Sequence, residues 1–164
     1  MSGYGFIIRI IGAGPIGLAA NICLWTVFFF LEKALRVPPI TIHPALRLIL
    51  LVLFITDAAY LIGYGLYLQR KNRSEKKLLT HGPYLFVRHP LYSALIYSAT
   101  GILALWLYSW GLIVAVVPIA VAWSWLVRKE EYYLLDTYGE KYRRYCETTG
   151  QFLPSFKNIN EKFS

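Results

Sequence analysis

Three long stretches with little or no charge constrain the fold of this 164-residue chain more than any other feature. No charged residue occurs between Ile10 and Leu31, and Asp57 is the only one in the stretch 48–68. A third uncharged stretch covers residues 91–127. A helix needs about 20 apolar residues to cross the hydrocarbon core of a bilayer. The pattern predicts an all-α, polytopic transmembrane helix bundle.

The third stretch is too long for one span, and residues 107–111 near its middle resemble a turn. Trp106, Tyr108 and Trp110 lie around this turn, and aromatic residues concentrate at membrane–water interfaces. We therefore expect two spans joined as a tight helical hairpin, which gives about four spans in total.

The net charge of +8 comes from basic residues that flank the apolar stretches, which favours a membrane protein over a nucleic-acid-binding one. Residues 69–90 and the tail from 128 onward are rich in lysine and arginine, whereas the loop 32–43 has only Lys33 and Arg36. Basic loops stay on the cytoplasmic side of membranes. We therefore expect both basic segments and both termini to be cytoplasmic, in a plasma (inner) or endoplasmic reticulum membrane.

The tail from Arg128 to about Thr149 is predicted to be a helix at the membrane surface or over the end of the bundle. Gly139 should kink or interrupt it, and Pro154 should end any helix. One face repeats every three or four residues, at Glu131, Leu134/Leu135, Tyr138, Tyr142 and Tyr145. The two cysteines, Cys23 and Cys146, form no metal-binding motif, so no metal is expected.

The sequence Gly12-Ala13-Gly14-Pro15-Ile16-Gly17 fits the G-x-G-x-x-G pattern of dinucleotide-binding folds. Such a fold needs alternating strands and helices downstream, whereas apolar spans follow here. Small residues also let neighbouring transmembrane helices approach closely. We therefore interpret these glycines as helix-packing residues.

Two other segments are more polar than membrane anchoring requires. In the first, Gly82-Pro83 predicts a turn and Pro90 starts a helix, so Arg88 and His89 should stand at a helix N-terminus. Such a position suits a carboxylate, although a snorkelling arginine would give the same pattern. The second segment, 128–131, has two adjacent acids directly after a span.

In that second segment Arg128 and Glu131 are three residues apart and can meet on one helix face. The Glu131 carboxylate would then hold a cationic cofactor or orient a catalytic arginine. A surface ion pair of little energetic value is the alternative interpretation.

Together the two segments resemble the isoprenylcysteine carboxyl methyltransferase family and the related phospholipid methyltransferases. The resemblance makes 76–155 the catalytic region, with 1–75 as a two-span anchor and 156–164 as a frayed tail of one membrane domain. Ala94 departs from the family pattern, in which a glycine is expected. The matching residues are Gly82, Tyr84, Arg88-His89-Pro90, Tyr92, Glu130-Glu131, Leu134, Tyr138-Gly139, Tyr142, Tyr145 and Pro154.

The resemblance implies an S-adenosyl-L-methionine-dependent methyltransferase acting on a lipid-like substrate that enters from the bilayer. It favours carboxyl O-methylation of a prenylcysteine or a similar lipidic carboxylate, with phospholipid amine N-methylation as the alternative. Alternatives of other classes are an NADPH-dependent membrane sterol-type reductase, whose family carries a comparable Arg-His-Pro-x-Tyr block, and a non-enzymatic membrane scaffold.

The resemblance also implies the site residues. The catalytic candidates are Arg88, Arg128 and Glu131. An arginine would hold an acceptor carboxylate, and Glu131 would balance the sulfonium charge or act as base toward an amine. The candidates for binding the cofactor are His81, Gly82, Tyr84, Val87, His89, Tyr92, Glu130 and Glu131, with Tyr84 or Tyr92 facing the sulfonium through cation–π attraction.

Overall fold

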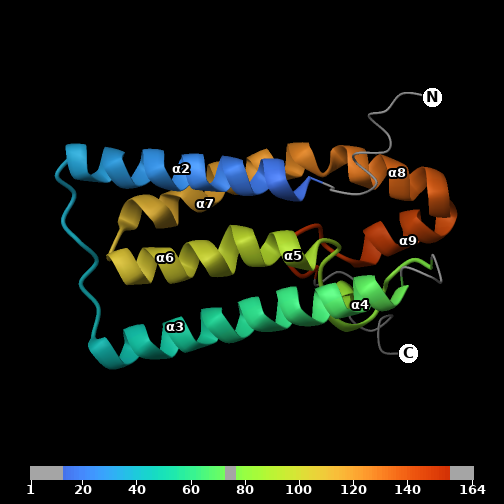
Figure 1. Ribbon diagram of the computed structural model, residues 1–164, viewed down its shortest axis with the longest axis horizontal. Helices are drawn as coiled ribbons and strands as arrows, with labels where there is room; N and C mark the ends of the chain where they lie inside the picture. Colours follow the sequence, from blue (N-terminus) through green and yellow to red (C-terminus); the bar gives the residue numbers. More distant parts are fainter. Residues whose placement is uncertain (1–12, 73–76, 156–164) are drawn as a thin grey trace.

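The computed structural model describes residues 13–72 and 77–155, whose regular structure is helical apart from one isolated bridge. This confirms the predicted all-α bundle, which Figure 1 shows from the side. The elements are α2 (Gly14–Ala34), α3 (Pro44–Ala59), η1 (Tyr60–Tyr64), α4 (Gly65–Asn72), η2 (Gly82–Leu85), α5 (Pro90–Ser93), η3 (Ala94–Ala99), α6 (Thr100–Leu107), α7 (Trp110–Leu126), α8 (Arg128–Tyr138) and α9 (Glu140–Thr148).

Within the described residues, three continuous helices are long and apolar enough to cross a membrane: Gly14–Ala34, Pro44–Asn72 and Pro90–Leu107. The fourth apolar helix, α7, has 17 residues and is joined to α8 through a bend of 41°. The structure therefore has three to four candidate spans, in agreement with the sequence. The second span is longer than its apolar stretch, because α4 adds a polar end that includes Arg70 and Lys71.

The last two spans form the predicted hairpin. Helix α6 ends at Leu107, Tyr108 takes a left-handed conformation with φ 54°, and Ser109 caps α7 by accepting a hydrogen bond from the Leu112 backbone N–H. The buried carboxylate of Glu32 also accepts the Gly111 N–H at 2.8 Å, at the positive end of α7. The side chains of Ser109 and Glu32 therefore accept hydrogen bonds from the first N–H groups of α7, which have no partner within the helix, and a short turn is enough to join α6 to α7.

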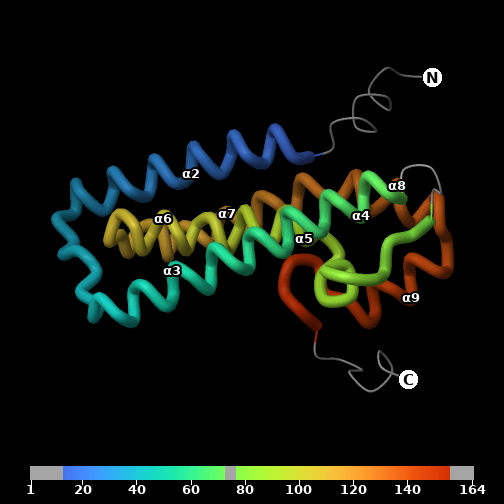
Figure 2. The backbone as a smooth tube through the Cα atoms, turned by 60° about the horizontal axis from the view of Figure 1, so that its bottom comes forward, coloured from blue at the N-terminus to red at the C-terminus, as the bar shows by residue number. Residues whose placement is uncertain are grey.

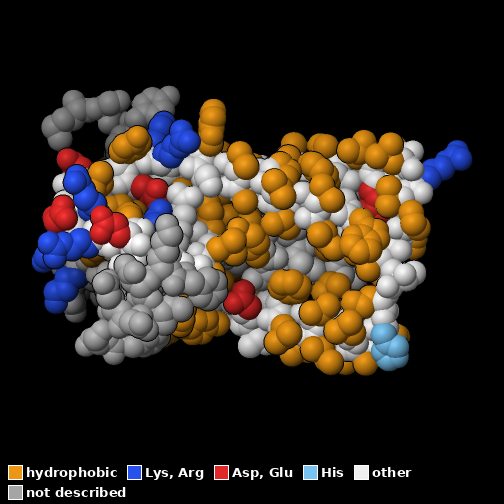
Figure 3. Space-filling model, turned by 180° about the vertical axis from the view of Figure 1, so that it is seen from behind, with side chains coloured by type: hydrophobic (Ala, Val, Ile, Leu, Met, Phe, Trp, Pro, Cys, Tyr) orange, Lys and Arg blue, Asp and Glu red, His pale blue; other side chains and the backbone are white. Residues whose placement is uncertain are grey.

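The two ends of the bundle differ in what they carry. The N-terminal end of α2, together with α4, α8 and α9, lies at one end, and the hairpin turn and the loop 35–43 lie at the other (Figures 1 and 2). In the space-filling view, hydrophobic side chains cover most of the length and charged ones gather at the end with α8 and α9 (Figure 3). The described parts of the two basic segments thus share one end, as their charge predicts.

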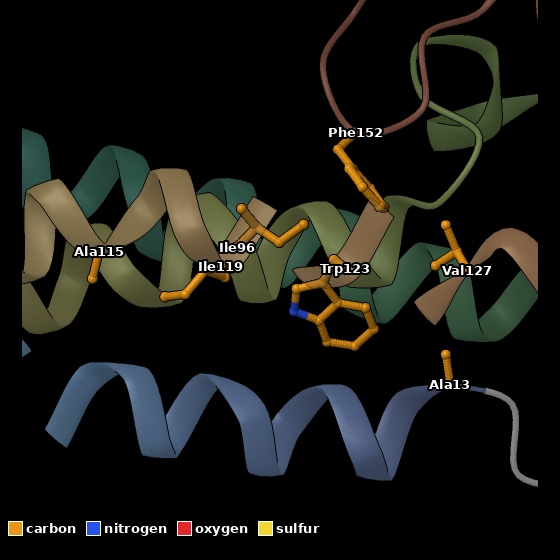
Figure 4. Close-up of a cluster of buried hydrophobic side chains, with 7 residues drawn as sticks. All are labelled: Ala13, Ile96, Ala115, Ile119, Trp123, Val127 and Phe152. Carbon is orange, nitrogen blue, oxygen red and sulfur yellow. The ribbon is translucent and has the colours of Figure 1, made fainter. Parts of the chain in front are cut away.

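A cluster of buried side chains joins α2, η3 and α7 around Trp123, which is fully buried (Figure 4). Gly17 makes room for this indole, since a β-carbon there would lie 2.2 Å from the ring. The indole N–H donates to Asn21 Oδ1 at 2.7 Å. Gly17 therefore serves helix packing, as interpreted from the sequence. The same interpretation was wrong for Gly14, because nothing lies within 4 Å of the position of its β-carbon, and Gly12 lies outside the described residues.

Some local features differ from the expectations. The second and third spans each contain a π-helical stretch, η1 and η3, that no apolar pattern predicted. Gly139 interrupts the tail helix, as predicted, with φ 55°. Tyr142 and Tyr145 are buried on its inner face, but Leu135 is exposed, because that face accommodates only one of the adjacent leucines. The termini predicted to be cytoplasmic, the frayed tail 156–164, and residues 10–12 lie outside the described residues.

Candidate active site

Arg88 and His89 reach the end of the bundle through a loop that the C-terminal segment holds in place. The Arg88 backbone N–H donates to Gly150 O at 2.8 Å, and the His89 N–H donates to Gln151 O at 3.2 Å. Val87 and Gly150 form the isolated parallel bridge of the same contact. These bonds satisfy backbone groups just before α5, where Pro90 starts the helix, as the sequence predicted.

The Glu131 carboxylate accepts most of the side-chain hydrogen bonds that this loop donates. Arg88 Nε and Nη2 donate to Glu131 Oε1 at 3.0 and 2.9 Å, so two guanidinium nitrogens bind one carboxylate oxygen. His89 Nε2 lies 3.3 Å from the same oxygen, a hydrogen bond that requires the proton on Nε2. The other oxygen, Oε2, accepts from Gln151 Nε2 at 3.0 Å.

These contacts change the acidity of Glu131. Burial acts to raise the pKa of its carboxyl, but the His89 hydrogen bond and the Arg88 charge outweigh burial and hold the pKa at about 2. The remaining Arg88 nitrogen, Nη1, donates to Thr149 O at 2.7 Å and to Cys146 O at 3.3 Å. The Arg88 side chain therefore ties the loop to both α8 and the end of α9.

Glu130 lies beside this pair with different partners. Its Oε1 accepts hydrogen bonds from the Tyr92 hydroxyl, at 2.9 Å, and from the Ala13 backbone N–H. Its Oε2 lies 3.9 Å from His89 Nδ1, and no residue in 13–72 or 77–155 donates a hydrogen bond to it. The Glu130 side chain is 19% exposed and the Glu131 side chain is 21% exposed, so exposure does not separate them; what distinguishes Glu130 Oε2 is that it has no donor within the described residues.

Aromatic rings and one buried hydroxyl surround the charged groups. The Tyr92 ring stacks on Trp123 at 4.4 Å and on His89 at 5.6 Å between centroids. Phe152 packs against His89 at 5.8 Å. The Tyr142 side chain is buried, and its hydroxyl faces the Cys146 thiol but has no oxygen or nitrogen partner within the described residues. A buried hydroxyl of this kind is suited to a polar ligand group.

The loop before Arg88 is fixed through Tyr84. Its hydroxyl accepts from Gln69 Nε2 at 2.8 Å, and its backbone oxygen accepts the Tyr145 hydroxyl. Burial raises the pKa of Tyr84 to about 12, against the hydrogen bond from Gln69, so the phenol stays neutral. Gly82 has φ 62° and packs against Tyr64, where a β-carbon would lie 2.6 Å from the ring.

Two predicted residues lie apart from the cluster. His81 is exposed at the start of η2. Arg128 is exposed, and its guanidinium carbon lies 5.4 Å from the centre of the Trp125 ring. The expected pairing of Arg128 with Glu131 was wrong, because Arg128 begins α8 directly after the 41° bend and folds back onto α7, while Glu131 binds Arg88.

Sequence reasoning missed several contributors. Gln151 and the backbone oxygens of Cys146 and Thr149 complete the shell of Arg88 and Glu131, and the Ala13 N–H completes that of Glu130. Contacts made by backbone groups do not depend on residue type, so the sequence could not predict them. Gln151 stands in a loop without periodicity, so no residue pattern singled it out.

The charges of the cluster do not cancel. Arg88 contributes one positive charge, and the Glu130 and Glu131 carboxylates contribute two negative ones, so the site carries a negative surplus when His89 is neutral. The charges of Arg88 and Glu131 largely neutralise each other through their ion pair. Glu130 Oε2, which accepts no hydrogen bond within the described residues, can therefore hold a cation or accept a proton at the end of the bundle.

A family model described as phospholipid methyltransferase matches residues 41–141, which is more than half of the chain. The match runs from the start of the second span to α9 and includes Arg88, His89, Glu130 and Glu131. Helix α2 and the segment 142–155, which completes the cluster, lie outside it. No curated protein and no solved structure matches the chain.

Proposed function

Because the chain belongs to the phospholipid methyltransferase family of membrane enzymes, we propose that it uses S-adenosylmethionine to methylate the amine of a lipid headgroup. The observation that supports the choice of an amine is that two carboxylates, Glu130 and Glu131, share one arginine, and that Glu130 Oε2 accepts no hydrogen bond within the described residues. The match to a methyltransferase family gives no support to the two alternatives of other classes, the sterol-type reductase and the non-enzymatic scaffold.

The residues present fit the cofactor. S-adenosylmethionine supplies, when bound, an electrophilic methyl group on a cationic sulfonium. Glu130 suits that positive charge, because its side chain is partly exposed and its Oε2 accepts no hydrogen bond within the described residues. The buried Tyr142 hydroxyl supplies a further polar partner on the Arg88 side of the cluster. Tyr92 holds Glu130 in place through its hydroxyl.

The cluster suits an amine acceptor better than a carboxylate. Four hydrogen bonds from Arg88 already go to Glu131 and to two backbone oxygens. Arg128, the other arginine expected to hold a carboxylate, stacks on Trp125 outside the cluster. Among the described residues no unpaired arginine lies in the cluster to receive a substrate carboxylate, which the Glu130 and Glu131 carboxylates would repel, whereas they would attract an ammonium headgroup.

In this proposal Glu130 is the catalytic residue, and Arg88 and Glu131 form its rigid frame. An ammonium headgroup must lose a proton before its nitrogen can attack, and because Glu130 keeps its charge for the sulfonium, that proton would pass to water at the end of the bundle. The cluster around Glu130 would hold the cofactor, which would supply its methyl group to the deprotonated nitrogen. Much of the rate enhancement would come from holding the two reactants in line.

The proposal is tested by identifying the methyl acceptor. The purified protein is incubated in nanodiscs with methyl-labelled S-adenosylmethionine, and either phosphatidylethanolamine or a prenylcysteine is supplied as acceptor. The expected product is labelled phospholipid whose label survives mild alkali, as N-methyl groups do. Label that appears only on the prenylcysteine and is released by alkali would establish the carboxyl methyltransferase alternative instead.

A ligand-binding comparison addresses the other enzyme class. S-adenosylmethionine is expected to raise the melting temperature of the purified protein, because a ligand that binds only the folded state stabilises it. Stabilisation by NADPH, with none by S-adenosylmethionine, would contradict methyl transfer altogether.

A further inference from the structure

We propose that Gln151 is a positioning residue, which aligns Glu131 and His89 with the membrane-spanning helix α7. This inference rests on the proposed methyltransferase function, and it assigns a role to a residue that lies beyond the region matched by the family. Gln151 is half-buried in the turn that follows α9.

Gln151 makes contacts with three parts of the site. Its Nε2 donates to Glu131 Oε2 at 3.0 Å. Its backbone oxygen accepts the His89 N–H at 3.2 Å. Its Oε1 lies 3.1 Å from the hydroxyl of Ser124 on α7. One residue thus links the carboxylate of α8, the loop before α5, and a span.

The amide of glutamine is suited to this link because it offers a donor and an acceptor at once. Oε1 of Glu131 accepts hydrogen bonds from Arg88 and His89. Among the described residues, only Gln151 donates a hydrogen bond to Oε2. Without Gln151, the carboxylate would keep its ion pair but lose the contact that fixes its rotation. The neighbouring carboxylate of Glu130 would then shift with α8.

The backbone of this segment is built to hold the contact. Gly150 has no room for a side chain, because a β-carbon there would lie 1.9 Å from Leu153 O. Phe152 is buried against the His89 ring. Gln151 is therefore held from both sides, which is the arrangement expected of a residue that orients others.

A glutamate at position 151 gives a test that simple loss of packing does not mimic. The charged groups around the position are Arg88, His89, Glu130 and Glu131, and Tyr142 and Cys146 face the same cluster. Ionised, a glutamate at position 151 has no donor for Glu131 Oε2 and repels it. Protonated, it donates an O–H to the same oxygen, and burial beside a like charge favours this form.

We therefore expect the kcat of Gln151→Glu to be at least roughly 10-fold below the parent at pH 8.5, and the ratio of the two to rise severalfold by pH 6. Gln151→Ala should lower kcat by a similar factor, with little change in the KM for cofactor. The ratio of the Gln151→Ala kcat to the parent kcat should not depend on pH. Thr148→Ala is the matched control, since the Thr148 hydroxyl bonds only to its own helix within the described residues.

Melting temperatures of the cofactor-free protein provide a second readout. The difference between Gln151→Glu and the parent should shrink as the pH falls from 8.5 to 6, because the introduced carboxyl takes up a proton in the folded state. A ratio of kcat and a melting difference that stay constant with pH, or full kcat in Gln151→Ala, would overturn the positioning role. If the parent itself transfers no methyl group, the proposed function fails, while the melting series still tests the contact.

Discussion

Arg88 joins a carboxylate and two backbone oxygens through one planar group, and this geometry makes its replacement by lysine non-conservative. A lysine ammonium is a point charge that cannot reproduce the Nε and Nη2 contacts with Glu131 together with the Nη1 contacts. We expect Arg88→Lys to lose about 3 kcal/mol of unfolding free energy, nearly as much as Arg88→Ala, since both leave Glu131 poorly paired.

Denaturant unfolding of the purified protein measures this loss. Arg144→Lys is the matched control, because the Arg144 side chain is 78% exposed and its ion pair with Glu140 is on the surface. A lysine at position 88 that keeps the stability of the parent would show that charge alone, without the planar geometry, holds the loop.

The pKa of Glu131 predicts how stability depends on acid. Because this pKa is about 2 in the folded protein and 4.5 is the ordinary value, Glu131 stabilises folding above pH 4.5. That contribution, on the order of 3 kcal/mol, is lost as the pH falls from 4.5 toward 2. The melting temperature should therefore fall in this range, and Glu131→Gln should flatten the fall. Glu147→Gln, at an exposed position on α9, should leave it unchanged.

The sequence indicated which residue types matter at the site, but not how they pair. The order of Arg88-His89 and Glu130-Glu131 along the chain brought both segments to one end, as expected. Helix spacing suggested Arg128 as a partner for Glu131, but Glu131 binds Arg88 from another element, and spacing within one helix carries no information about contacts between elements. Gln151 was missed because a loop contact leaves no periodic pattern.

At the scale of elements, the close approach of α2 to α7 depends on Gly17. A β-carbon at this position would meet the Trp123 ring, which is fully buried and cannot move freely. We expect Gly17→Ala to cost about 1–3 kcal/mol through overpacking. Gly14→Ala is the matched control, because nothing lies within 4 Å of the position of its β-carbon.

Thermal unfolding of the two variants checks this prediction. Equal melting temperatures for Gly14→Ala and Gly17→Ala would mean that the helices separate easily and that the packing around Trp123 contributes little. A loss confined to Gly17→Ala would confirm that the N-terminal span is packed against the half of the chain that carries the site.

The helical elements could largely be predicted because uncharged length and the aromatic turn are strong signals. The hairpin at residues 107–111 and the break at Gly139 were both predicted. The π-helical stretches η1 and η3 were not, because one extra residue in a turn changes the helix period without changing the composition. Those stretches set which side of each span faces its neighbour.

For the whole molecule, the charge pattern predicts its orientation in the membrane. The described basic segments and the polar cluster share one end, so both should face the cytoplasm. In a variant without Cys23 and Cys146, we expect Thr41→Cys to react with a membrane-impermeant maleimide in intact cells. Thr137→Cys, on α8, should react only after the cells are permeabilised.

The reverse labelling pattern would place the cluster on the outer side, away from the cytoplasmic supply of S-adenosylmethionine. Labelling of both positions in intact cells would mean that the helices do not cross the bilayer as assigned. Both residues are exposed, so the reaction reports the side of the membrane and not burial in the protein.

The most direct test is a calorimetric titration of the purified protein with S-adenosylmethionine, comparing the parent with Glu130→Gln and with Glu147→Gln. Saturable binding to the parent and to Glu147→Gln is expected, with affinity at least about 10-fold weaker in Glu130→Gln because a charge-assisted contact is lost. Absence of binding to the parent, or equal affinity in all three proteins, would contradict a sulfonium cofactor held at the Glu130 carboxylate.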